Sequence, residues 1–271
     1  MAQRQGYDVV IDPDESSERD LGETELHFQE FNDPMDGSLG SGPSRYPKPP
    51  GDGAGKRLLW SIQFYAQYFD IDTKDLFARM WAAIYPRTMF FDVLDGNPDL
   101  YGPFWILTTV IVVLFVSSTV AGYVASHASG AAYQYDFSLL SAAAAMMYGY
   151  STLIPLGLWF ALRWYRCEAA NLLDCIALYG YGNLVWIPVA LVSTCPFEIL
   201  NWTTLAAFIR WASIVVGFIV SGFFLFRNLT PIINTVDAKT ARLLLIVLVL
   251  FHAGISLAIK FVFFAYKVRK A

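Results

Sequence analysis

The sequence predicts an all-α integral membrane protein with five transmembrane helices, preceded by cytosolic amphipathic helices and a disordered acidic N-terminal tail. Hydrophobic residues make up 56% of the chain and charged residues 15%, against about 45–50% and 25% in soluble domains. One apolar run, Phe104 to Ala125, carries no charge. At about 1.5 Å of rise per residue, this run is long enough to cross the roughly 30 Å hydrocarbon core of a bilayer.

The first part of the chain, 1–55, is expected to be a disordered acidic cytosolic tail. Residues 1–40 hold eleven carboxylates against two arginines, and a stretch rich in Gly, Pro and Ser follows. This composition lacks the apolar area that offsets chain entropy. Leu26, Phe28 and Phe31 interrupt the acidic run, so the tail is either a plain solubilising segment or a short motif that folds on a partner. The acidic start argues against a signal peptide and against nucleic acid as a partner.

Residues 56–98 are expected to form two cytosolic or interfacial amphipathic helices. Asp72, with a second acidic residue three places on at Asp75, indicates a helix start. The helices are too polar to span a membrane. Their aromatic side chains either lie in the membrane interface or pack on the cytosolic ends of the spans. Phe77 and Trp81 are the candidate residues here for recognition of a cytosolic partner.

The remainder, 99–271, is expected to be a membrane domain with five spans. Their approximate ranges are 104–126, 138–162, 175–194, 203–226 and 243–266. Basic residues concentrate in the loops after the second and fourth spans: Arg163, Arg166, Arg227, Lys239 and Arg242. Because cytosolic loops carry the excess of Lys and Arg, the N-terminus is predicted to be cytosolic and the C-terminus lumenal. The basic residues near the C-terminus oppose this orientation.

Three titratable side chains lie inside the predicted spans, namely Arg210, His252 and Lys260. No Asp or Glu falls within these spans to complete a proton relay or a cation site, which favours packing or snorkelling over transport. Glycines occur singly rather than in a phosphate-binding loop, and the three cysteines have no metal-ligand spacing. The sequence therefore predicts no enzyme, no catalytic residue, no cofactor and no metal.

The segment Asp99-Leu100-Tyr101-Gly102-Pro103 stands directly before the first span and has the composition of a turn. Pro103 fixes its own φ, Gly102 relieves backbone crowding, and Asp99 can cap a helix start. We expect this junction to fix the angle at which the first span enters the membrane and to couple the forepart to the bilayer.

The third span carries Tyr179-Gly180-Tyr181, followed by Pro188, and the second span carries a similar Tyr-Gly-Tyr. Glycine allows close approach of a neighbouring helix, and buried tyrosine hydroxyls need hydrogen-bond partners. These segments are therefore expected to form a packed seam between helices.

Together these features resemble the Yip family of Ypt/Rab-interacting, five-span Golgi membrane proteins. The acidic tail, the segment 69–73 (Phe-Asp-Ile-Asp-Thr), the junction 99–103 and the Gly-Tyr span at 179–181 with Pro188 carry the resemblance over about 58–266. The chain is most similar to the branch with the Phe-Asp-x-Asp-Thr forepart. The resemblance implies that the junction and the Gly-Tyr residues are family motifs or partner-binding positions.

The resemblance also implies a function. It indicates residence in Golgi and early secretory membranes, with cycling to the ER or endosomes, and a part in vesicle-mediated transport. The expected partners are Rab-type small GTPases, other Yip-family membrane proteins and the lipid bilayer. The protein is interpreted as a non-enzymatic adaptor or membrane receptor for these GTPases and other trafficking factors. The alternatives are a small-solute or ion transporter, and a lipid-handling or membrane-shaping protein.

Overall fold

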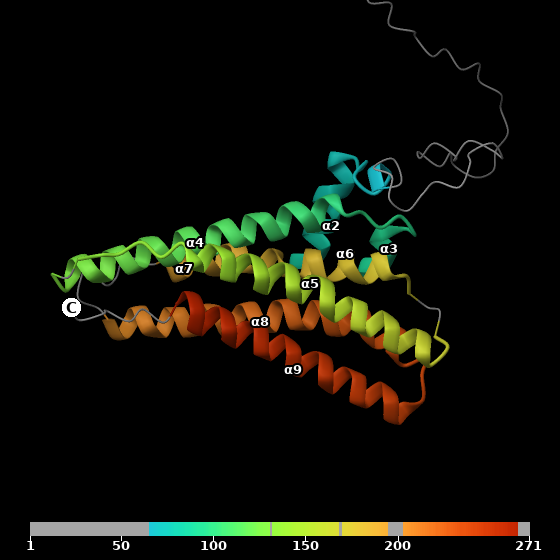
Figure 1. Cartoon of the computed structure of the whole chain (residues 1–271). Coiled ribbons are helices and arrows are strands. Elements are labelled where there is room, and N and C mark those ends of the chain that lie inside the picture. The colour runs from blue at the N-terminus through green and yellow to red at the C-terminus, as the bar shows by residue number, and fades with distance from the viewer. Residues whose placement is uncertain (1–64, 131, 168–169, 195–202, 265–271) are drawn as a thin grey trace, which may run out of the picture. The chain divides into compact units, whose positions relative to one another are not determined.

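The computed structural model describes residues 65–130, 132–167, 170–194 and 203–264, all of which belong to one compact unit, Gly55–Ala271. Every regular element among them is helical (Figure 1). The elements are α2 (Thr73–Ile84), α3 (Phe90–Leu94), α4 (Tyr101–Ala128), α5 (Ser138–Trp164), α6 (Leu172–Gly182), the 3-10 turn η1 (Asn183–Val185), α7 (Trp186–Ser193), α8 (Thr203–Ile233) and α9 (Ala238–Phe263). The expected acidic tail, with Leu26, Phe28 and Phe31, lies outside the described residues.

Five helical segments in the described part of the chain are long and apolar enough to cross a membrane. They are Tyr101–His127, Ser138–Trp164, Leu172–Ser193, Thr204–Ile233 and Ala238–Phe263. This confirms the predicted fold class. The third segment is composite, because α6, η1 and α7 follow one another without a break. Its most apolar window is 72% buried, against 22% for the last segment, so the third span is central and α9 is peripheral.

The third span begins earlier than its predicted start, which brings Asp174 into the first turn of α6. The Asp174 carboxylate accepts the backbone N–H of Asn171 at 3.2 Å. A carboxylate is favourable at a helix N-terminus because it meets the positive end of the helix dipole. The expectation that no acidic residue falls within a span is therefore wrong at this helix end.

Helix α2 packs on the bundle through a face other than its aromatic one. Asp72 caps it as predicted, by accepting the N–H of Lys74 at 3.5 Å. Its buried residues are small or charged (Arg79, Ala82 and Ala83) and lie toward α3, α6 and α8. Phe77 and Trp81 point outward, with 62% and 67% of their surface exposed. Helix α2 thus packs against the bundle, and the bundle leaves its aromatic face uncovered.

Candidate functional site

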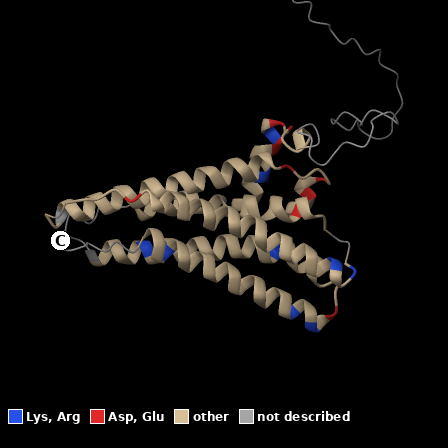
Figure 2. Cartoon of the chain, in the orientation of Figure 1, with Lys and Arg blue, Asp and Glu red and all other residues tan. Residues whose placement is uncertain are grey.

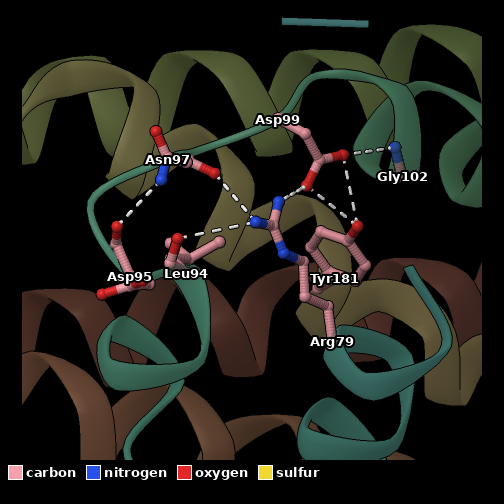
Figure 3. A network of polar contacts seen from close by, with 7 residues as sticks. All are labelled: Arg79, Leu94, Asp95, Asn97, Asp99, Gly102 and Tyr181. Atoms are coloured by element: carbon pink, nitrogen blue, oxygen red, sulfur yellow. Dashed lines mark hydrogen bonds and ion pairs between the residues drawn. The ribbon is translucent and has the colours of Figure 1, made fainter. Parts of the chain in front are cut away.

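The junction before the first span is built around a buried ion pair between Arg79 of α2 and Asp99, shortly before α4 (Figure 3). The two side chains are only 3% and 5% exposed. The guanidinium Nη2 also donates to the carbonyl oxygens of Asn97 at 2.9 Å and Leu94 at 3.5 Å. Because a buried charge is costly unless it is paired and hydrogen-bonded, these contacts hold α2 against the start of α4.

The Asp99 carboxylate binds two further donors. Its Oδ1 accepts the backbone N–H of Gly102 at 2.7 Å, which is the predicted capping role. The hydroxyl of Tyr181 donates to the same carboxylate, with distances of 3.2 Å to Oδ1 and 3.0 Å to Oδ2. One carboxylate therefore joins α2, the start of α4 and α6, three elements that are separate in the sequence (Figure 3).

Two of the predicted glycines lie at a single crossing between α4 and α6. A Cβ added to Gly102 would lie 2.0 Å from the hydroxyl oxygen of Tyr181. A Cβ added to Gly180 would lie 2.4 Å from Cβ of Pro103 and 2.8 Å from its Cα. Neither position has room for a side chain. The turn-like junction and the Gly-Tyr motif are thus two sides of one seam.

Helix α3 covers this seam and connects it to α8. Phe90 is fully buried, with its ring centroid 5.3 Å from that of Tyr181 and 5.2 Å from that of Phe224. Its backbone N–H donates to Oδ1 of Asn228 at 2.6 Å. Asn228 in turn donates to the carbonyl of Phe224 at 2.8 Å. The seam between α4 and α6 is therefore supported by contacts with α2, α3 and α8.

Not every residue of the predicted motifs belongs to this network. Leu100 and Tyr101 are half-buried beside it. Tyr179 packs instead against Tyr150, with ring centroids 5.5 Å apart. Pro188 is exposed on α7. The structure thus brings together Asp99, Gly102, Pro103, Gly180 and Tyr181, and leaves the other motif residues outside the hydrogen-bonded centre.

Arg79 is a central residue of the site that the sequence patterns do not single out. It lies on the buried side of α2, one turn after Leu76 and one turn before Ala83. A charged residue at helical spacing within a row of inward-facing apolar residues is the signal that could have found it. Such a residue needs a buried counter-charge, and Asp99 supplies it.

A second buried polar cluster surrounds His252 of α9. The hydroxyl of Tyr150 lies 2.8 Å from Nδ1, and Oγ of Ser221 lies 2.9 Å from Nε2. With the hydroxyl proton of Ser221 on the carbonyl of Gly217 at 2.7 Å, a neutral His252 ring donates from Nε2 to Ser221 and accepts from Tyr150 at Nδ1. His252 therefore connects α5, α8 and α9, which agrees with a packing role.

The two cations inside the predicted spans also have partners. Lys260 donates to the carbonyl of Phe264 at 3.1 Å and lies 5.1 Å from the ring centroid of Trp211. Arg210 donates to the carbonyl of Ser193, with Nε 3.4 Å from the oxygen. These contacts favour packing over transport. No group of three or more His, Cys, Asp or Glu among the described residues is placed to hold a metal ion.

The five spans and the buried junction define a multi-pass helical membrane protein whose forepart helix is bound to the bundle by an ion pair. The chain belongs to the Yip family: the family model described as the Yip1 domain matches residues 81–258. This confirms the resemblance drawn from the junction and the Gly-Tyr span.

Several proteins are similar to this chain in sequence. The chain is 40% identical over 207 residues to Protein YIP5 of Schizosaccharomyces pombe, covering 76% of this chain and 80% of the relative. It is 30% identical over 216 residues to the Protein YIPF1 homolog of Dictyostelium discoideum, covering 79% and 59%. It is 28% identical over 230 residues to Protein YIP5 of Saccharomyces cerevisiae, covering 79% and 74%. No solved structure matches.

Proposed function

We propose that this protein is a non-enzymatic adaptor of Golgi and early secretory membranes that binds Rab-type small GTPases and other trafficking factors. Membership of the Yip family supports this class of function. The observation that carries the proposal is how α2 is held. Arg79 fixes the helix to the membrane domain, while Phe77 and Trp81 remain outward and uncovered. A rigidly mounted, exposed aromatic face is suited to serve as a docking surface.

The polar groups of the junction support a structural joint rather than a reaction centre. Arg79, Asp99 and Tyr181 form hydrogen bonds to one another and to neighbouring backbone groups. In this proposal the family-motif residues do not touch the partner. They set the position of α2, and the membrane domain anchors the assembly and associates with other Yip-family members.

The outward face of α2 can be tested directly. In the full chain reconstituted in nanodiscs, Phe77→Ala combined with Trp81→Ala is expected to weaken binding of a Rab-type GTPase at least about tenfold. Loss of even one aromatic hot spot costs about 2 kcal/mol, which exceeds the ~1.4 kcal/mol of a tenfold change. Binding is measured by pull-down with GDP- and GTP-loaded protein. Trp105→Ala removes a half-exposed aromatic from α4 and is the matched control, with binding unchanged.

Deletion of residues 1–55 separates this proposal from its rivals. The truncation is expected to weaken GTPase binding only modestly. If it abolishes binding while the Phe77 and Trp81 variant still binds, the recognition element is the tail with Leu26, Phe28 and Phe31. If the double variant keeps the GTPase and the nanodisc-embedded protein instead loses the ability to tether added protein-free liposomes, the face of α2 acts on lipid, and the membrane-shaping alternative is favoured.

We also propose that the N-terminus is cytosolic and the C-terminus lumenal. Lys and Arg gather at the end of the bundle that holds the connection between α8 and α9, which supports a cytosolic position for that end (Figure 2). A glycosylation acceptor appended well beyond Ala271 is therefore expected to be modified in cells, and one at the N-terminus is not. The reverse pattern would invert the orientation, and absence of glycans at both ends would contradict the number of spans.

A further inference from the structure

An apolar cavity of about 250 Å³ lies between α8 and α9. The two helices diverge toward their connection in Figure 1. The walls of the cavity come from both helices and from Tyr179 of α6. On α9 the lining runs from Leu245 to His252, about two turns or roughly 10 Å. Tyr179, one of the motif residues outside the hydrogen-bonded centre of the junction, thus forms part of this wall.

The cavity opens on the surface that faces the bilayer. Ile219, Phe223 and Val249 line it, and each is about half exposed. These residues belong to two helices that are long and apolar enough to span a membrane. Apolar cavities of this kind stay free of water. An empty cavity would leave its walls without dispersion contacts. The surrounding phase offers one apolar filler, which is hydrocarbon.

His252 makes one end of the cavity rigid without making it polar. Both ring nitrogens are bonded to other helices, to Tyr150 and Ser221. The ring carbon Cδ2 lies toward Gly222, 3.2 Å from where a Cβ on that glycine would stand. The imidazole therefore presents a carbon edge at the wall, and the absence of a side chain at Gly222 leaves the adjoining space open.

We propose that this cavity binds one hydrocarbon chain of a bilayer lipid, which enters past the half-exposed Ile219, Phe223 and Val249 and reaches His252. The chain fills the space between the two helices and supports α9, whose span is the least buried of the five described. This site is independent of the GTPase-binding role proposed for α2, so each can fail without the other.

The test uses the full chain in nanodiscs of phosphatidylcholine doped with a phosphatidylcholine that carries a diazirine in one acyl chain. After irradiation, peptide mass spectrometry is expected to find labelling at Leu225 and Leu248, which line the cavity, several-fold above that at Leu114, which is buried and does not line it. Native mass spectrometry is expected to retain one phospholipid on the wild-type protein. Uniform labelling along both faces of α9, with no retained lipid, would overturn the proposal.

Variants that fill the cavity provide the specificity test. Gly222→Leu is expected to lower labelling at these positions at least about fivefold, because a filled space excludes the chain. Val249→Trp covers the opening from the rim and is a second route to the same result if the glycine variant does not fold. Gly157→Leu is the control, since Gly157 is exposed on α5 with nothing within 4 Å of an added Cβ. Undiminished labelling in a folded variant would exclude the site.

Discussion

Asp99→Asn is expected to destabilise the protein by about 3–5 kcal/mol, because removing one partner of a buried ion pair leaves the other charge uncompensated. Arg79 is buried, and its remaining acceptors would be the carbonyl oxygens of Asn97 and Leu94. The same substitution also weakens two hydrogen bonds that the carboxylate accepts, one from the backbone N–H of Gly102 and one from the hydroxyl of Tyr181. The measurement is denaturant-induced unfolding of the detergent-solubilised protein.

A double-mutant cycle isolates the ion pair from these other effects. Arg79→Met alone is expected to cost a similar amount, and Arg79→Met with Asp99→Asn to cost clearly less than the sum, since no lone charge remains. Arg79→Lys keeps the charge but loses the planar fork that reaches two carbonyls, so its loss should be intermediate. Additive costs in the double variant would contradict a coupled pair.

A surface arginine provides the control for the cycle. Arg242 is exposed at the start of α9, and Arg242→Met is expected to change stability by no more than about 0.5 kcal/mol. If this variant is as unstable as Arg79→Met, loss of positive charge in general, rather than loss of the buried pair, explains the effect.

The fold class follows from the sequence because length and hydropathy alone decide whether a helix can cross a membrane. The apolar runs predict the spans without any knowledge of their neighbours, and the caps at Asp72 and Asp99 are local as well. The extension of the third span to Leu172 was missed, because the polar Asp174 resembles a loop residue until its capping of Asn171 is seen.

The centre of the site could not be predicted, because it depends on contacts between distant parts of the chain. Asp99 and Tyr181 each belong to a recognisable motif, but no local pattern says that the two meet. The face of α2 was equally ambiguous. Phe77 and Trp81 form the more hydrophobic stripe, yet the helix buries Arg79 and two alanines, because the ion pair and close packing decide the contact.

The cavity beside His252 is also a tertiary property. The sequence identifies His252 as a polar group inside a span, which marks it for attention. Its partners Tyr150 and Ser221 lie on two other helices, and the cavity next to it is lined by residues of α6, α8 and α9. Neither feature has a periodic signature.

Gly180→Ala is expected to destabilise the protein by about 1–3 kcal/mol or more, the range of overpacked interiors. The new methyl group would lie 2.8 Å from Cα of Pro103, a backbone atom, so α4 and α6 must move apart. That movement would lengthen the hydrogen bond from Tyr181 to Asp99 and loosen the attachment of α2. Gly102→Val is expected to act in the same direction, because its Cβ would overlap the Tyr181 hydroxyl.

Two glycines inside the membrane-spanning helix α5 serve as controls, because their replacement by alanine should not destabilise the protein. Gly149 and Gly157 lie inside α5 with nothing within 4 Å of an added Cβ. Alanine is the better helix former by up to about 1 kcal/mol, so Gly149→Ala and Gly157→Ala should be neutral or slightly stabilising. The measurement is again denaturant-induced unfolding, with the subcellular distribution of each variant followed by microscopy. If Gly180→Ala is as stable as Gly149→Ala and reaches the same membranes, the seam between α4 and α6 is not the close contact that positions α2, because a seam this tight cannot accept a methyl group without cost.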